Sequence, residues 1–178
     1  METDLIKIHN FAKENENENY NFRIFLKGYD EEKLDSIVHR LFKQVLVRID
    51  CTTCGNCCRN IRPILTEKDI MKLSKAMNIT PEQFMKRYVE KDEDGDDTFE
   101  HIPCPFLSNN KCTQYEARPR DCVSYPHLHK KGFVFRLLNV INNYSICPIV
   151  FNVYEALKSE LRSDYSMYQD ENDDLLYY

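Results

Sequence analysis

Four cysteines within eight residues, in the run CTTCGNCC at 51–58, constrain this chain more than any other feature. Thiols two residues apart along a turn converge on one metal ion with little strain. Packing of cysteines as small hydrophobic side chains would not produce this regular spacing. A thioredoxin-type pair belongs next to a βαβ pattern, whereas this run follows a long predicted helix. The run therefore predicts metal binding.

The candidate metal ligands are all eight cysteines of the chain: Cys51, Cys54, Cys57, Cys58, Cys104, Cys112, Cys122 and Cys147. Three cysteines at this spacing, with a distant Cys-Pro as fourth ligand, are typical of a [4Fe–4S] cluster. The chain has two such Cys-Pro pairs, at 104–105 and 147–148. Eight thiols would equally hold two zinc ions with four thiolates each. The spacing favours an iron–sulfur cluster over zinc, and it does not decide which metal is bound.

The adjacent pair Cys57 and Cys58 sets a further question. Neighbouring side chains are expected to diverge, so we expect only one of the two to serve a given ion, and the sequence does not say which. Four thiolates on Zn²⁺ or on [4Fe–4S]²⁺ leave a net negative charge, which nearby arginines would offset. Arg59 and Arg118 fit this role and an ordinary surface position equally well. Arg62 and Arg120 are expected to be ordinary surface residues.

Composition places the chain among ordinary globular proteins. It has 178 residues, of which 42% are hydrophobic and 30% charged, and its net charge is −5. No basic region predicts nucleic-acid binding, and no apolar stretch is long enough for a transmembrane helix or a signal peptide. We therefore expect a cytoplasmic protein, in a reducing compartment where thiols stay available to metal.

Apolar residues three and four positions apart predict a helix over 31–50 that leads directly into Cys51. Further helices are expected to begin near Thr66, to begin near Thr80, and to cover 148–163. We expect the helices at 31–50 and 148–163 to pack together. That packing would bring Cys51 and Cys147 within reach of one metal site.

Strand-like composition at 98–102 and 133–138 predicts a small two-stranded element between irregular, proline-containing segments. The expected fold class is mainly α with this small β element, in a single metal-stabilised domain. We expect a polar N-terminal helix or arm at 1–20, the cysteine-cluster domain at 21–163, and an acidic, flexible tail at 164–178.

The chain resembles the YkgJ-type cysteine-cluster family, the CxxCxxCC zinc- or iron-chelating domain, over roughly residues 20–160. The segments that carry the resemblance are DCTTCGNCCRN at 50–60, LTEKDIMKLSKAMNITPEQFMKRYV at 65–89, CPFLSNNKCTQYEARPRDCVSYPH at 104–127 and ICP at 146–148. The family is defined by eight cysteines, and each has a counterpart here.

The resemblance implies metal chelation by these eight cysteines. Larger relatives include flagellin lysine N-methylases, in which a similar cysteine cluster is thought to hold an iron–sulfur centre. This chain has Val123 after Cys122, where many relatives are expected to have arginine, which weakens any transfer of methylase activity.

Three functions are compatible with these observations. The first is a metal-binding protein with an iron–sulfur cluster, or zinc, in a redox or group-transfer role. The second is a structural zinc module that binds a protein partner, and the third is a metal carrier or sensor. The sequence contains no motif that names a catalytic residue, so it does not decide whether the protein is an enzyme.

Overall fold

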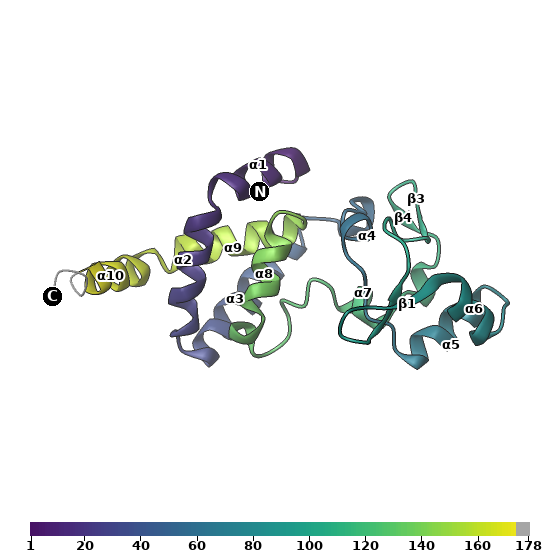
Figure 1. Cartoon of the computed structure of the whole chain (residues 1–178). Helices are drawn as coiled ribbons and strands as arrows, with labels where there is room; N and C mark the ends of the chain where they lie inside the picture. Colours follow the sequence, from purple (N-terminus) through teal and green to yellow (C-terminus); the bar gives the residue numbers. More distant parts are fainter. Residues whose placement is uncertain (174–178) are drawn as a thin grey trace. The chain divides into compact units, whose positions relative to one another are not determined.

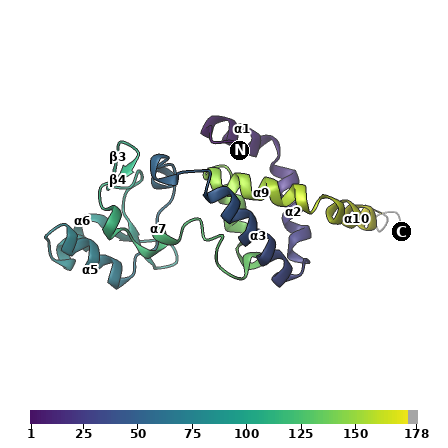
Figure 2. The ribbon, with the colours of Figure 1, turned by 180° about the vertical axis from the view of Figure 1, so that it is seen from behind.

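The computed structural model describes residues 1–173, and most of them are helical (Figures 1 and 2). Two short two-stranded antiparallel sheets complete the secondary structure of this described part. The predicted fold class, mainly α with a small β element, is confirmed. The chain forms two compact units: unit 1 comprises residues 1–49 and 126 onward, and unit 2 comprises residues 50–125.

Unit 1 is helical. Its elements are α1 (Leu5–Glu14), α2 (Glu16–Lys27), α3 (Glu31–Leu46), the 3-10 helix η3 (Phe133–Arg136), α8 (Leu137–Tyr144), α9 (Pro148–Glu160) and α10 (Arg162–Asp173). Helix α3 packs against α9, as predicted for the helices at 31–50 and 148–163. The apolar stripe of α3 and the inner face of α9 form the core; its fully buried side chains include Leu34, Val38, Val150, Val153 and Leu157.

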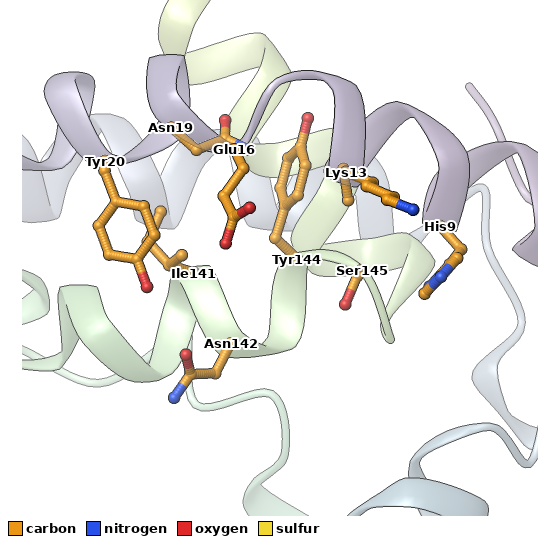
Figure 3. Close-up of a pocket in the computed structure, with 10 residues that line it drawn as sticks. His9, Lys13, Glu16, Asn19, Tyr20, Ile141, Asn142, Tyr144 and Ser145 are labelled. Carbon is orange, nitrogen blue, oxygen red and sulfur yellow. The ribbon is translucent and has the colours of Figure 1, made fainter.

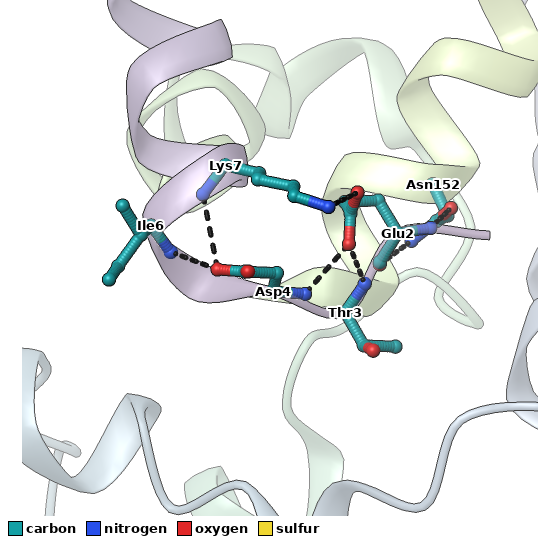
Figure 4. A network of polar contacts seen from close by, with 6 residues as sticks. All are labelled: Glu2, Thr3, Asp4, Ile6, Lys7 and Asn152. Atoms are coloured by element: carbon teal, nitrogen blue, oxygen red, sulfur yellow. Dashed lines mark hydrogen bonds and ion pairs between the residues drawn. The ribbon is translucent and has the colours of Figure 1, made fainter.

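The N-terminal helices belong to this core. Ile8 of α1 and Phe22 of α2 are fully buried, and α2 crosses the boundary predicted between residues 20 and 21. The chain start is also tied down, since the Glu2 backbone N–H donates to Asn152 Oδ1 at 3.0 Å, and Asn152 Nδ2 donates back to the Glu2 carbonyl (Figure 4). Residues 1–20 are therefore an integral part of unit 1.

A buried carboxylate explains why residues 133–138 do not form the predicted strand. Asp35 of α3 accepts hydrogen bonds from the backbone N–H groups of Gly132, at 2.7 Å, and Phe133, at 2.8 Å. Gly132 has φ +72°, a left-handed conformation that glycine adopts without steric cost, and it turns the chain into η3 and α8. The strand prediction was wrong because a short apolar run fits a buried helix as well as a strand.

The predicted flexible tail begins inside α10. Tyr29 O–H donates to Asp164 Oδ2 at 2.7 Å, which holds the first turn of α10 against the end of α2. The rest of the tail, residues 174–178, lies outside the described residues. Within residues 1–173, no helix combines the length and the apolar character needed to cross a lipid bilayer.

A shallow pocket of unit 1 lies where α1 and α2 face α8 (Figure 3). His9, Lys13 and Glu16 line it from the N-terminal helices, and Asn142 and Ser145 line it from α8 and its end. Its walls carry both positive and negative side chains, so the pocket selects no particular charge.

Unit 2 has short elements. They are the 3-10 helix η1 (Cys51–Thr53), α4 (Cys57–Asn60), α5 (Glu67–Ala76), α6 (Pro81–Tyr88), β1 (Val89–Lys91), β2 (Asp97–Phe99), β3 (Leu107–Ser108), β4 (Lys111–Cys112), the 3-10 helix η2 (Tyr115–Ala117) and α7 (Arg120–Ser124). Strand β2 falls at the start of the predicted strand 98–102, and it pairs with β1 rather than with residues 133–138.

Capping fixes the two longer helices of unit 2. Thr66 and Asp69 form a full capping box at the start of α5, and Thr80 and Gln83 form another at the start of α6, beside Pro81. The helices begin where the sequence predicts.

The core of unit 2 is small. Seven buried residues form it, namely Leu65, Ile70, Leu73, Phe84, Phe99, Phe106 and Ala117. The partly buried side chains of Cys104 and Cys112 pack against this cluster. Two of the candidate ligands therefore lie at the edge of the core of unit 2.

Candidate metal centre

The cysteine run begins with a tight turn. The Asp50 carboxylate accepts hydrogen bonds from the Thr52 backbone N–H, at 2.9 Å, and from the Thr52 hydroxyl, at 2.6 Å. The Cys54 N–H donates to the Cys51 carbonyl at 3.3 Å, which closes one turn of η1. Gly55 then takes a left-handed conformation with φ +63°, which redirects the chain into α4. The C-x2-C spacing is thus built from a single helical turn.

The run is held against the hairpin of β3 and β4. A Cβ atom at Gly55 would lie 3.0 Å from the Asn110 carbonyl O, so the two backbones approach closely. Arg59 spans the same junction, because its guanidinium donates both to the Cys54 carbonyl, at 3.2 Å, and to Asn110 Oδ1. These contacts place the run beside the strand that carries Cys112.

A backbone hydrogen bond joins Cys58 to Cys104. The Cys104 N–H donates to the Cys58 carbonyl O at 2.7 Å. The Leu107 N–H donates to the Cys104 carbonyl at 3.0 Å, and Leu107 pairs with Cys112 across the hairpin. Three of the eight cysteines are therefore brought together by main-chain contacts.

The fourth cysteine of this group comes from α7. Asp69, which caps α5 and is buried, also accepts a hydrogen bond from the Arg120 N–H at 2.9 Å. The Asp121 carboxylate accepts from the Ile64 N–H at 3.4 Å. Together these contacts fix the start of α7 and with it the position of Cys122.

The pKa shifts of these thiols agree with the grouping that the backbone contacts give. Burial, and after it the negative charges of the Cys104, Cys58 and Cys112 thiolates, raise the pKa of Cys122 to about 12. Burial likewise raises the pKa of Cys104 to about 11, with smaller contributions in the same direction from the Cys58 and Cys112 thiolates. The pKa of Cys112 is raised by burial first and then by the Cys58 thiolate. We call Cys58, Cys104, Cys112 and Cys122 the four-thiol group.

Cys57 and Cys58 do not diverge as predicted. Their Sγ atoms lie 4.0 Å apart, because both short side chains turn toward each other on the first turn of α4. This contact is the largest cause of a pKa of about 7 for Cys58, and the positive charge of Arg59 lowers the pKa further.

Three further predicted ligands, Cys51, Cys54 and Cys147, differ in their exposure to solvent. Cys51, at the start of η1, is exposed, and Cys54, at its end, is half-buried. Burial and the nearby Asp50 carboxylate are the main causes that raise the pKa of Cys51. Cys147 is buried and belongs to unit 1, whereas Cys51 belongs to unit 2. The placement of Cys51 and Cys147 at one metal site therefore stays a prediction.

The arginines near the cysteines in sequence have different surroundings. Arg59 lies next to Cys58, and the positive charge of Arg118 partly offsets the burial that raises the pKa values of Cys51 and Cys112. The Arg118 guanidinium stacks on the Tyr115 ring, 3.7 Å from its centroid, and donates to the Tyr115 carbonyl at 2.7 Å. Arg62 instead pairs with Glu90 at the surface. Sequence reasoning missed Asn110 and Tyr115, which hold the two cationic side chains; an Asn-Asn turn before Cys112 was the available signal.

The donor set fits a soft metal ion. Four half-buried thiols would supply the thiolate ligands of such an ion. The two guanidinium groups nearby would balance the negative charge of the four-thiolate centre. Among residues 1–173, no three Cys, His, Asp or Glu side chains already converge as closely as metal ligands do. None of the eight cysteines forms a disulfide.

A small folded unit with several thiols close together is typical of cysteine-rich metal-binding domains. A family model described as "CxxCxxCC: Putative zinc- or iron-chelating domain" matches residues 50–148, more than half of the chain, and the chain belongs to this family. The matched segment contains all eight cysteines. No curated protein and no solved structure matches the chain. The family supports metal binding in general and does not distinguish zinc from iron.

Proposed function

We propose that the chain is a metal-binding protein whose four-thiol group holds one metal centre, and that this centre stabilises unit 2. The observation that carries the proposal is the set of main-chain contacts that joins the segments of Cys58, Cys104 and Cys112, with the start of α7, which carries Cys122, held by Asp69. The raised pKa values of Cys104, Cys112 and Cys122, to which neighbouring thiolates contribute, agree with this grouping. A metal ion bound by all four would link α4, the loop before β3, the hairpin and α7.

The small core of unit 2 supports a structural role. A core of seven buried residues supplies limited stability, and metal sites in small domains supply folding free energy directly. Burial raises the pKa values of Cys104 and Cys122, so without metal these side chains remain neutral thiols at pH 7. Metal binding would displace the protons of these thiols. The bound ion would then link the segments that carry the thiols at the edge of the core of unit 2.

Zinc is the occupant that the four-thiol group favours. Zn²⁺ takes four ligands in a closed structural site, and this group offers that number without the exposed Cys51 or the half-buried Cys54. Zn²⁺ would supply charge and fixed coordination, with no redox chemistry of its own. The residues around it would orient the thiols and, through Arg59 and Arg118, offset the negative charge.

An iron–sulfur centre is the second candidate, and the C-x2-C-x2-C spacing of Cys51, Cys54 and Cys57 favours it. Such a centre would give the protein a redox or group-transfer role rather than a purely structural one. The two candidates differ in colour, in metal content and in the cysteines they need.

Metal analysis of protein purified without oxygen tests the proposal. We expect about one zinc per four-thiol group and no visible absorption band. Removal of the metal with a strong chelator should abolish the cooperative unfolding transition of unit 2. Hydrogen exchange of the backbone amides of residues 50–125 measures this loss. Iron and sulfide with a broad visible band would establish the second candidate. A chain that holds no metal and keeps unit 2 folded would contradict both.

A further inference from the structure

The contact between Cys57 and Cys58 supports an inference that rests on the proposed function and goes beyond it. Cys58 belongs to the four-thiol group, whereas Cys57 is assigned no role in that centre. The two Sγ atoms are 4.0 Å apart, and both side chains are partly exposed. A reagent from solvent can therefore reach a ligand of the metal centre and its neighbour together.

The distance is short enough for bond formation. A disulfide requires an S–S separation of about 2.05 Å, so rotation of the two side chains and an adjustment of the backbone between them must close the difference. Cα atoms of adjacent residues are about 3.8 Å apart across a trans peptide bond, less than the usual 4.4–6.8 Å of disulfides. A Cys57–Cys58 disulfide would therefore store strain and be reduced easily. Strained and accessible disulfides are the reversible, regulatory kind.

We propose that Cys57 and Cys58 form a peroxide-sensitive modification site, and that their oxidation to a disulfide releases the metal from the four-thiol group. Hydrogen peroxide is the oxidant. The Cys57 sulfur attacks one peroxide oxygen, the O–O bond breaks, and Cys57 becomes a sulfenic acid as the second oxygen leaves as water. The Cys58 sulfur then attacks the Cys57 sulfur, and the sulfenic oxygen leaves as water.

Electrons and protons balance over the two steps. Two thiols and one hydrogen peroxide give one disulfide and two waters, so two electrons pass from sulfur to oxygen. Cys58 loses the thiolate that it contributes to the metal. The remaining three ligands, Cys104, Cys112 and Cys122, come from different segments and bind the ion more weakly as a set of three.

The matched variants are Cys57→Ser and Cys54→Ser in the full chain. Both remove one thiol of the run, and neither removes a member of the four-thiol group. Each protein is loaded with Zn²⁺ and treated with hydrogen peroxide. Released zinc is followed with a chromogenic chelator, the new disulfide is located by peptide mass spectrometry, and reversal by dithiothreitol is tested.

We expect the wild type and Cys54→Ser to release zinc at the same rate, and Cys57→Ser to release it roughly tenfold more slowly. We also expect the disulfide to map to Cys57–Cys58 in the first two proteins. Release from Cys57→Ser at the wild-type rate, or a disulfide between other cysteines, would overturn the inference. Loss of zinc from untreated Cys57→Ser alone would instead overturn the assignment of the four ligands, and so the proposed function.

Discussion

The Cys104 backbone N–H donates a hydrogen bond to the Cys58 carbonyl O at 2.7 Å, across a separation of 46 positions in the chain. This contact joins the cysteine run to the loop that precedes the β3–β4 hairpin. Because it uses main-chain atoms, it leaves both thiols available to a metal. The backbone of unit 2 therefore brings the segments that carry Cys58 and Cys104 together.

A first prediction concerns membership of the four-thiol group. Cys104→Ser should weaken zinc binding by more than about 100-fold, because loss of a ligand costs more than the 10–100-fold typical of residues behind the ligands. Cys54→Ser should bind zinc as the wild type does. Competition titration with a chelator of known affinity measures both. Equal losses of zinc affinity in the two variants would contradict the assignment of Cys104, and not Cys54, to the four-thiol group.

Charge compensation by Arg59 gives the second prediction. Arg59→Gln removes the positive charge beside Cys58 and the link between Cys54 and Asn110, so zinc affinity should fall by about tenfold. Arg62→Gln is the control, because Arg62 pairs with Glu90 at the exposed surface. The same competition titration reads out both variants, and an unchanged affinity in Arg59→Gln would rule out the electrostatic role.

The close approach at Gly55 leads to a third prediction, on stability. Gly55→Ala places a Cβ atom 3.0 Å from the Asn110 carbonyl in a left-handed backbone conformation. Gly95→Ala meets the same backbone penalty with no atom within 4 Å. We expect Gly55→Ala to lower the free energy of unfolding by about 1–3 kcal/mol more than Gly95→Ala, which is the usual cost of overpacking. Urea denaturation of the zinc-loaded chain measures both free energies of unfolding. Equal effects in the two variants would show that the Asn110 backbone moves away from the new Cβ atom at little cost.

A fourth prediction concerns alkaline pH. Burial first, and then the neighbouring Glu155 carboxylate, raise the pKa values of Tyr144 and Tyr154 above their ordinary value of 10.0. The unfolded chain therefore ionises these tyrosines at a lower pH than the folded chain does. Their contribution to stability is complete below pH 10 and is lost as the pH rises beyond it.

Denaturation at pH 9 and pH 11 measures the effect. Because each tyrosine ionises more readily in the unfolded chain, it should reduce the free energy of unfolding by up to about 1.4 kcal/mol for each pH unit above its pKa in the unfolded chain. Tyr144→Phe should lose less stability over this interval than the wild type, because one ionising group is gone. A variant with an unchanged pH dependence would show that Tyr144 ionises normally in the folded chain.

Local sequence signals were sufficient for much of the helical architecture. Thr66 and Thr80 mark helix starts because their side chains cap the first turn, and the apolar periodicity of α3 identifies its buried face. Residues 133–138 could not be assigned in this way. Their helical state depends on Asp35, which lies almost a hundred positions earlier in the chain.

The sequence by itself determined that this is a cysteine-rich, metal-binding chain, because thiol spacing in the run at 51–58 is a local property. Only the tertiary structure grouped Cys58 with Cys104, Cys112 and Cys122 and brought Cys57 within 4.0 Å of Cys58. Those relationships depend on hydrogen bonds between distant segments and on side-chain rotation. Neither is encoded in the spacing of residues along the chain.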